Sequence, residues 1–133
     1  MVNDNATVVT AAILLRGDEV LLARRPVGDR LAGHWELPGG KLELGESPEE
    51  CLARELAEEL GIDAVVGPLF TESTHVYPHA TIRLLAYRIE RWTGELQLQA
   101  HDEHRWVSLL EVEELTLAPA DIPILARLRD EFH

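Results

Sequence analysis

The sequence has a single cysteine among its 133 residues, and this scarcity already limits what the protein can be. One thiol cannot form an intramolecular disulfide, and without partner cysteines it cannot build a cysteine-rich zinc site. We therefore expect Cys51 to be a small side chain within a helix, in a protein of a reducing compartment, the cytoplasm.

Positive charge is also scarce, because 12 lysines and arginines face 24 aspartates and glutamates, for a formal net charge of −12. Binding to a nucleic-acid polymer requires a basic surface that displaces counterions, so the sequence argues against a nucleic-acid partner. A free nucleotide is not excluded, since a metal ion and a few arginines suffice to hold it.

Long hydrophobic runs are missing as well. No apolar segment approaches the roughly 20 residues that span a bilayer, and the chain does not begin with a charged and then apolar leader. We expect no membrane partner. With 46% hydrophobic residues the chain can form a core, and its length suits one domain over residues 1–133.

The best-marked element is a helix expected over residues 48–60. Ser47 is a suitable N-cap, Pro48 stands at the first helical position, and Glu50 can complete a capping box. Gly61 follows at the place where helices commonly end in a left-handed turn. The sequence therefore defines both the start and the end of this helix.

Two faces of this helix differ in character. At about 100° per residue, one narrow stripe is apolar and comprises Leu52, Leu56 and Leu60. Glu55, Glu58 and Glu59 converge on a neighbouring face, with only Arg54 nearby to relieve their repulsion. A solvated acidic face would carry more basic residues, so we interpret the three carboxylates as ligands of Mg²⁺ or Mn²⁺ rather than Zn²⁺.

Upstream of the helix, residues 33–41 contain the paired glycines Gly39 and Gly40, which allow close approaches that side chains forbid. Alone, Pro-Gly-Gly would be an ordinary turn. Combined with Glu46 and the acidic helix at fixed spacing, it predicts that a backbone carbonyl of this turn reaches the metal.

The rest of the chain alternates short β-rich runs with turns. Residues 8–15 and 20–24 are expected to form a hairpin around a turn at 16–19. Further strands are expected over residues 64–70, 73–77, 81–90, 95–99 and 105–109. A last helix is expected over 122–132, with an apolar face of Ile122, Leu125, Leu128 and Phe132. Helices that follow separate groups of strands indicate an α/β sandwich.

The spacing around the acidic helix resembles that of a known family. Residues 40–62 are identified as a complete Nudix box through Gly40, Glu46, Arg54, Glu55, Leu56, Glu58, Glu59, Gly61 and Ile62. A less specific likeness to the MutT branch and to bacterial CTP pyrophosphohydrolase extends over nearly the whole chain. The resemblance implies the Nudix fold, an α/β (α+β) sandwich with a mixed β-sheet between helices.

The resemblance also implies a reaction. The carbonyl matching Gly39 joins Glu55, Glu58 and Glu59 as a ligand of Mg²⁺, or of Mn²⁺ in its place, and Arg54 orients Glu55. Water attacks within the phosphate chain and releases a nucleoside monophosphate and pyrophosphate. Which phosphorus is attacked is left open.

The general base has two candidates. One is a metal-held glutamate of the helix, and the other is a carboxylate from the loop 100–104, which in the family lies opposite the box. Within that loop we favour Glu103, although the register of the MutT branch falls near Ala100 and keeps Asp102 open. A solvated polar turn is the competing interpretation.

Several residues are assigned to the nucleotide by resemblance. Arg24 and Arg25 end a strand whose alternation sends their side chains to opposite faces, and we assign Arg25 to the substrate and Arg24 to the surface. Lys41 either balances phosphate charge or is simply exposed. Glu36 is either a satisfied polar residue of the turn or part of the nucleotide pocket, which the resemblance favours.

Asp121 has two interpretations that do not exclude each other. It precedes Ile122 and Pro123 and is well placed to cap the last helix. By resemblance it also aligns with the asparagine that reads the base in the MutT branch, where CTP pyrophosphohydrolase has aspartate. Ionised aspartate only accepts hydrogen bonds, which favours a base edge with a donor, such as the cytosine N4 amino group or an oxidised guanine.

Three functions compete. The first is a magnesium-dependent nucleoside triphosphate pyrophosphohydrolase for cytosine or modified nucleotides, the second a Nudix hydrolase of ADP-ribose or dinucleoside polyphosphates, and the third a non-catalytic nucleotide-binding module. The short chain and the matches at Arg24, Arg25 and Asp121 favour the first over the second, although Tyr77 and Pro78 could mark the second. The intact glutamates argue against the third. The expected partner is a small nucleotide, bound by a monomer or a homodimer.

Overall fold

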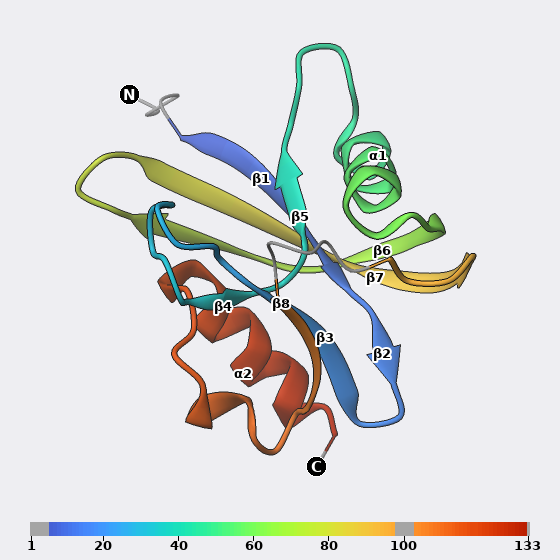
Figure 1. The fold of residues 1–133 in the computed structure, drawn as a ribbon. Helices are drawn as coiled ribbons and strands as arrows, with labels where there is room; N and C mark the ends of the chain where they lie inside the picture. The colour runs from blue at the N-terminus through green and yellow to red at the C-terminus, as the bar shows by residue number, and fades with distance from the viewer. Residues whose placement is uncertain (1–5, 98–102, 133) are drawn as a thin grey trace.

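A computed structural model describes residues 6–97 and 103–132 of the chain (Figure 1). The strands are β1 (Thr7–Ile13), β2 (Leu15–Arg16), β3 (Glu19–Arg24), β4 (Trp35–Glu36), β5 (Gly39–Lys41), β6 (Asp63–Val76), β7 (Thr81–Thr93) and β8 (Glu103–Ser108). The helices are α1 (Pro48–Leu60), α2 (Ile122–Asp130) and two short 3₁₀ turns, η1 (Val112–Glu114) and η2 (Pro119–Asp121). No helix in these two ranges is long and apolar enough to cross a membrane.

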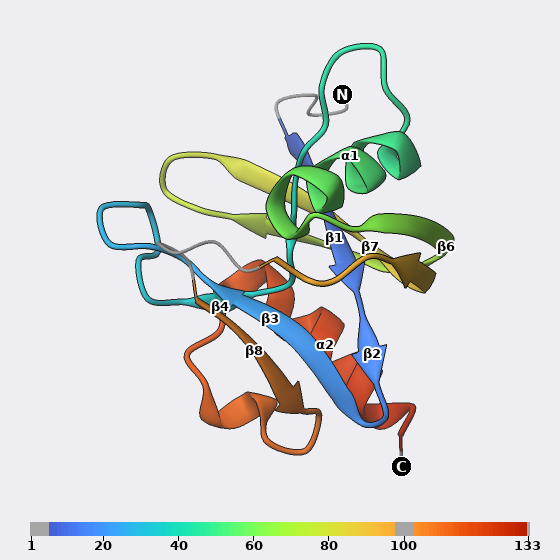
Figure 2. The ribbon, with the colours of Figure 1, turned by 45° about the vertical axis from the view of Figure 1, so that its right-hand side comes forward.

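The strands form two four-stranded sheets. In the first sheet the order is β5-β1-β7-β6, with β1 and β7 parallel and the other neighbours antiparallel. The second sheet is centred on β3, which pairs with β2, β4 and β8 (Figure 2). The first sheet is therefore mixed.

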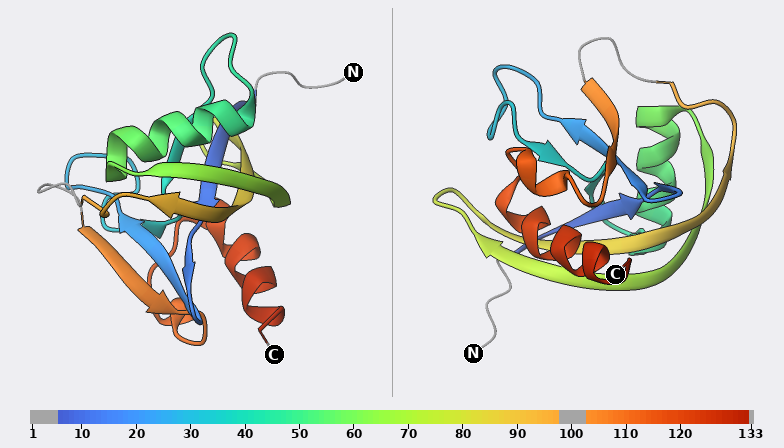
Figure 3. Two further views of the ribbon diagram at one scale, coloured as in Figure 1. Left: turned by 90° about the vertical axis from the view of Figure 1, so that its right-hand side faces the viewer. Right: turned by 90° about the horizontal axis from the view of Figure 1, so that it is seen from below.

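Helices cover both faces of the first sheet, with α1 on one side and α2 on the other (Figure 3, left). Alternation along β1 supplies both cores, because Ala11 and Ile13 pack on the α2 side while Ala12 and Leu14 pack on the α1 side. The predicted fold class, a mixed sheet between helices, is confirmed.

Helix α1 forms as its sequence predicts. The Ser47 hydroxyl accepts the Glu50 N–H at 3.1 Å, and the Glu50 carboxylate accepts the Ser47 N–H at 2.8 Å, which completes the capping box. Gly61 ends the helix with φ 69° in the left-handed region. The predicted apolar stripe is fully buried and comprises Leu52, Leu56 and Leu60, with Cys51 buried beside it.

The hairpin expected between residues 8–15 and 20–24 is wrong for most of its length. Strand β1 pairs with β5 and β7, and only the two residues of β2 pair with β3. Residues 10–14 are buried on both faces, which is typical of a central strand next to a parallel neighbour. The chain therefore passes from the first sheet to the second at Leu14.

The two strands expected over residues 64–70 and 73–77 form one strand, β6. Register shifts near Val65, Val66 and Leu69 show bulges that let the pairing with β7 continue past the expected break. Strand β7 also runs on to Thr93, three residues beyond the end expected at residue 90. Residues 95–97 are not in a strand, and residues 98 and 99 of the strand expected there lie outside the described residues.

The last helix is shorter than expected and turned about its axis. It ends at Asp130, and the side chains of Ile122 and Phe132, expected on the apolar face, are 49% and 44% exposed. The buried residues are instead Ile124, Leu125 and Leu128. The short turn η2 ends at Asp121, directly before the helix, and α2 starts at Ile122 as the sequence pattern predicts.

Candidate active site

A cavity of about 590 Å³ opens beside the glycines that precede α1. Four residues predicted for the substrate line this cavity, namely Arg25, Glu36, Lys41 and Asp121, and so does the predicted metal ligand Gly39. Apolar side chains of the α2-side core complete the wall, including Val9, Leu37, Leu84 and Ala120. The structure thus brings together residues that are up to about a hundred positions apart in the sequence.

Arg25 and Glu36 form an ion pair in the cavity wall. The Arg25 Nη1 atom donates to both carboxylate oxygens of Glu36, at 3.0 and 3.1 Å. Arg25 also pairs with Asp29 at 3.2 Å and donates to the Arg30 carbonyl at 2.7 Å. Burial raises the pKa of the Glu36 carboxyl, and the positive charge of Arg25 opposes that shift without cancelling it.

Asp121 is the most deeply buried charged residue of this wall, with 4% of its surface exposed. Its Oδ2 atom accepts the Leu37 N–H at 2.8 Å. Asp121 occupies the N-cap position of α2 as expected, but among the described residues its carboxylate makes no capping hydrogen bond to that helix. The side chain turns toward β4 because Leu37 offers it a buried donor.

The pKa of Asp121 lies well above its usual range. Burial is the largest cause, the nearby Glu36 carboxylate adds to it, and the Leu37 hydrogen bond and the Arg25 charge oppose it. A neutral carboxylic acid offers a donor as well as an acceptor, so the protonation of Asp121 decides what the cavity can present to a ligand.

The raised pKa predicts that the contribution of Asp121 to stability falls as pH rises. Between the ordinary aspartate pKa of about 3.9 and the higher folded value, the native state holds a proton that the unfolded state has released. The stabilisation contributed by Asp121 is therefore fully present below pH ~3.9, and it is lost as pH rises toward the pKa of the folded state. Asp121→Asn removes this term and still accepts the Leu37 N–H.

The measurement is urea unfolding of the wild-type protein and Asp121→Asn at several pH values from 5 to 9. The free energy of unfolding of the variant relative to wild type is expected to grow as pH rises. A constant difference over this range would contradict the buried, proton-binding state of Asp121.

Two residues that the sequence did not indicate also line the cavity, namely Tyr77 and His79. The sequence suggested Tyr77 only as a mark of the second function, and it gave no role to His79. They follow the end of β6, in the hairpin to β7, and no local pattern indicates that this hairpin folds back to the glycines. A polar-aromatic pair at a hairpin tip was the only available signal.

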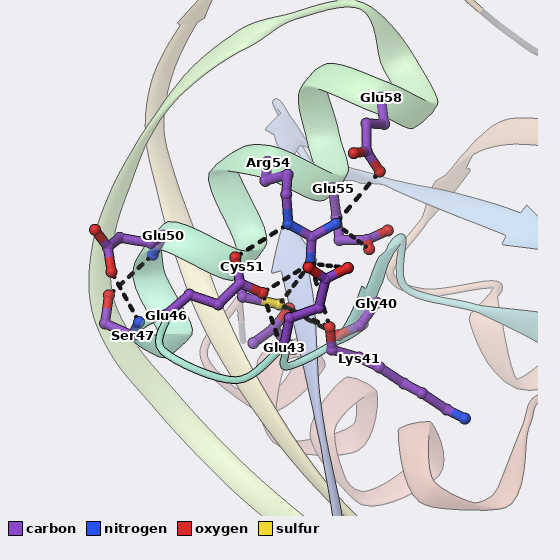
Figure 4. A network of polar contacts seen from close by, with 11 residues as sticks. Gly40, Lys41, Glu43, Glu46, Ser47, Glu50, Cys51, Arg54, Glu55 and Glu58 are labelled. Carbon is purple, nitrogen blue, oxygen red and sulfur yellow. Dashed lines mark hydrogen bonds and ion pairs between the residues drawn. The ribbon is translucent and has the colours of Figure 1, made fainter.

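The box residues form a network around Arg54 (Figure 4). Its guanidinium contacts Glu46 at 2.7 and 3.0 Å, Glu55 at 2.9 Å and Glu58 at 3.3 Å. Glu43 lies 3.6 Å away. The hydrogen bonds from Arg54 lower the pKa of Glu46 to about 2 and raise the pKa of Arg54 itself. Arg54 therefore ties the loop before α1 to the acidic face of the helix.

The acidic face does not present a closed metal site in this arrangement. Within residues 6–97 and 103–132, no three aspartate, glutamate, histidine or cysteine side chains gather closely enough to hold a metal ion. The physical reason is Arg54, whose guanidinium lies against Glu55 and Glu58 and supplies the neutralising charge. Glu58 is 60% exposed and Glu59 is half-buried.

The glycines nevertheless leave the space that an oxygen-ligand site needs. A Cβ atom on Gly40 would lie 2.2 Å from the Glu55 carboxyl carbon, so the carboxylate rests directly on the glycine backbone. The candidate ligand atoms here are carboxylate and carbonyl oxygens, which suit a hard divalent cation. The residues present therefore fit Mg²⁺ or Mn²⁺.

Gly39 is oriented so that its carbonyl can serve as a ligand. The Ala12 N–H donates to the Pro38 carbonyl, and the Leu42 N–H donates to the Val8 carbonyl. Bonded positions alternate along an antiparallel ladder, so the N–H and C=O of Gly39 point away from β1. Because β5 ends the order of its sheet, they point outward from the sheet edge.

Gly40→Ala is expected to lower turnover about 10- to 100-fold with little change in stability. The added methyl group must displace the Glu55 carboxylate, whereas the φ of Gly40 is one that alanine tolerates. Steady-state kinetics and thermal unfolding test this. Gly17→Ala is the control for turnover alone, because a Cβ there meets nothing within 4 Å, while its φ of 62° predicts a loss of stability. Wild-type turnover in Gly40→Ala would contradict a role for the Glu55 position.

The structure places Glu103 at the start of β8, opposite Arg24 of β3. Its carboxylate pairs with Arg24 at 2.5 Å and with Arg105 at 3.0 Å, on the face of the sheet where both guanidinium groups lie over Trp35. Glu103 and Arg24 do not belong to the cavity wall. The alternatives at Ala100 and Asp102 lie outside the described residues.

Lys41 lies at the boundary between the cavity wall and the Arg54 network. It belongs to the cavity wall, and its side chain extends away from the Arg54 network (Figure 4). Together with Gly39 and Gly40, it forms the strand β5 that separates the α2-side cavity from the carboxylates of α1. The cavity and the acidic face thus meet along one short edge strand.

Comparison with known proteins agrees with the resemblance seen in the sequence. Residues 6–128 match the family described as NUDIX domain. A CTP pyrophosphohydrolase of Escherichia coli (strain K12) is 43% identical over 117 residues, which make up 88% of this chain and 87% of the relative. An 8-oxo-dGTP diphosphatase of the same organism is 35% identical over 112 residues, 84% of this chain and 87% of the relative.

Solved structures agree with these relatives. The Escherichia coli ORF135 protein superposes with a TM-score of 0.81 at 41% identity, covering 92% of this chain and 87% of that chain. The MutT protein from Methanosarcina mazei Go1 superposes with a TM-score of 0.85 at 28% identity and covers 98% of both chains.

Proposed function

The chain belongs to the Nudix family, and we propose that it hydrolyses nucleoside triphosphates to the monophosphate and pyrophosphate. One observation carries the proposal. Gly39 and Gly40 lie between the cavity on the α2 side, which Asp121 lines, and the carboxylates on the α1 side. A base in the cavity would place its phosphates beside glycines, where no side chain blocks the way to Glu55.

The cavity suits a nucleoside. Its volume of about 590 Å³ falls within the range of small-molecule sites, and it combines apolar walls with a few polar groups. Asp121 would read the base, and Arg25 and Glu36 would complete the polar wall. Lys41, at the rim beside the glycines, would face the phosphate charge.

Nudix hydrolases generally use divalent metal ions, and here the proposed cofactor is Mg²⁺, with Mn²⁺ as a substitute. Glu55, Glu58, Glu59 and the Gly39 carbonyl would hold it. When bound, the cation would neutralise phosphate charge and make water a better nucleophile. Arg54 contacts two of these glutamates and would hold their carboxylates in position.

A carboxylate must take the proton of the attacking water, and two candidates stay open. One is a glutamate of α1, which already lies at the proposed metal site. The other is Glu103, which would have to leave its ion pairs with Arg24 and Arg105. Those ion pairs favour the helix glutamate.

Nudix pyrophosphohydrolases act on small nucleotides, and the substrate proposed here is a cytosine or an oxidised guanine nucleotide. The names of the relatives support this choice, and so does an acceptor at Asp121. The buried free thiol of Cys51 is consistent with the reducing cytoplasm, where such nucleotides occur.

The proposal is tested by incubating the protein and magnesium with CTP, dCTP, 5-methyl-dCTP, 8-oxo-dGTP, dGTP, ADP-ribose and diadenosine polyphosphates. Chromatography should show a monophosphate and pyrophosphate from the cytosine or oxidised triphosphates. Cleavage of ADP-ribose or the dinucleotides alone would replace the proposal with the second function. Absence of any cleavage would leave a nucleotide-binding module.

A further inference from the structure

Tyr77 forms part of the cavity wall just after β6 ends. Its ring packs between two imidazoles, with His75 edge-on at 4.5 Å and His79 stacked at 5.5 Å. The Tyr77 N–H donates to the Ala80 carbonyl at 2.8 Å, which closes the hairpin turn. These contacts set the position of the phenolic oxygen before any ligand arrives.

The phenolic oxygen links this hairpin to the segment that carries Asp121. It accepts the Ala120 N–H at 3.2 Å, and Ala120 precedes Asp121 in η2. A tyrosine hydroxyl is one donor as well as an acceptor, so its proton is still available. Across residues 6–97 and 103–132, no other protein group shares a hydrogen bond with this hydroxyl.

The surroundings of Tyr77 keep its hydroxyl protonated, and Tyr77 lies in the cavity wall. Burial raises the pKa of Tyr77, and the carboxylates of Asp121 and Glu36 raise it further, against the hydrogen bond from Ala120. The phenol is therefore neutral and able to donate at physiological pH. A donor and the Asp121 carboxyl consequently stand in the same part of the wall.

We propose that Tyr77 determines specificity, because its hydroxyl donates a hydrogen bond to an acceptor on the nucleobase held in the cavity. This inference rests on the proposed function, since it requires a base at this place. With Asp121 as acceptor and Tyr77 as donor, the wall complements a base edge that has a donor beside an acceptor. The N4 amino group and N3 of cytosine form such an edge.

The test is titration calorimetry of the wild-type protein, Tyr77→Phe and Tyr87→Phe with CMP, 8-oxo-dGMP and pyrophosphate. Tyr87 is the other tyrosine of the chain, and it lies buried in the α1-side core, away from the cavity. The monophosphates report on the base site without turnover, and pyrophosphate is a probe that has no base. Thermal unfolding of the three proteins accompanies the titrations.

Tyr77→Phe is expected to weaken the tighter-binding monophosphate about 10-fold or more, with unchanged pyrophosphate affinity. A small loss of stability is expected as well, because the Ala120 N–H loses its acceptor. Tyr87→Phe should bind all three probes as wild type does. The inference is overturned by wild-type monophosphate affinity in Tyr77→Phe, by a parallel loss of pyrophosphate binding, or by a wild-type protein that binds neither monophosphate. Failure of hydrolysis with base-dependent binding intact would instead refute the proposed function alone.

Discussion

Glu58→Gln is expected to lower turnover about 10²- to 10⁴-fold while the fold stays intact. Glu58 is 60% exposed, so the neutral amide should not disturb folding. The substitution removes a charge from the proposed metal site and from the ion pair with Arg54. Steady-state kinetics with the best triphosphate, over a range of magnesium concentrations, measures the effect.

Glu49→Gln is the matched control, because Glu49 is exposed in the first turn of the same helix and outside the Arg54 network. Both variants should unfold within about 0.5 kcal/mol of wild type, as exposed substitutions commonly do. Wild-type turnover in Glu58→Gln would remove Glu58 from the metal ligands and weaken the assignment of the acidic face.

Asp121→Asn is expected to shift selectivity from cytosine toward oxidised guanine nucleotides by about 10-fold or more in kcat/KM. The amide oxygen can still accept the Leu37 N–H, so the local structure should be kept. An ionised carboxylate only accepts, whereas the amide also offers a donor to a base carbonyl. The measurement is kcat/KM for CTP and for 8-oxo-dGTP.

The difference in selectivity between the wild-type protein and Asp121→Asn should increase with pH. At low pH the wild-type carboxyl is protonated and, like the amide, offers both a donor and an acceptor. Asp130→Asn is the control, because Asp130 is exposed at the end of α2. An unchanged selectivity ratio in Asp121→Asn at every pH would show that Asp121 does not contact the base.

The acidic helix could be predicted in detail because its signals are local. Ser47, Glu50 and Gly61 act within one or two turns, and the contacts of the capping box join residues three positions apart. The same holds for the apolar stripe that packs α1 on the sheet. The box spacing also identified the family, which the comparison with known proteins confirms.

The general roles of the acidic side chains were only partly predictable. The sequence indicated repulsion among the carboxylates of α1, and the resemblance implied that Arg54 orients Glu55. Neither showed that Arg54 would also lie against Glu46 and Glu58. That arrangement depends on how the loop before the helix folds back over it. The roles of these residues in binding metal stay predictions.

By itself, the sequence determined the helix and its caps, the acidic face, the glycine turn and the family, all of which depend on neighbours along the chain. Only the tertiary structure decided where β1 leaves one sheet for the other and what surrounds Asp121. Its partner Leu37 lies 84 positions away, and Tyr77 reaches Ala120 across 43. Contacts between such distant segments form only when sheets and helices pack, because no local propensity encodes them.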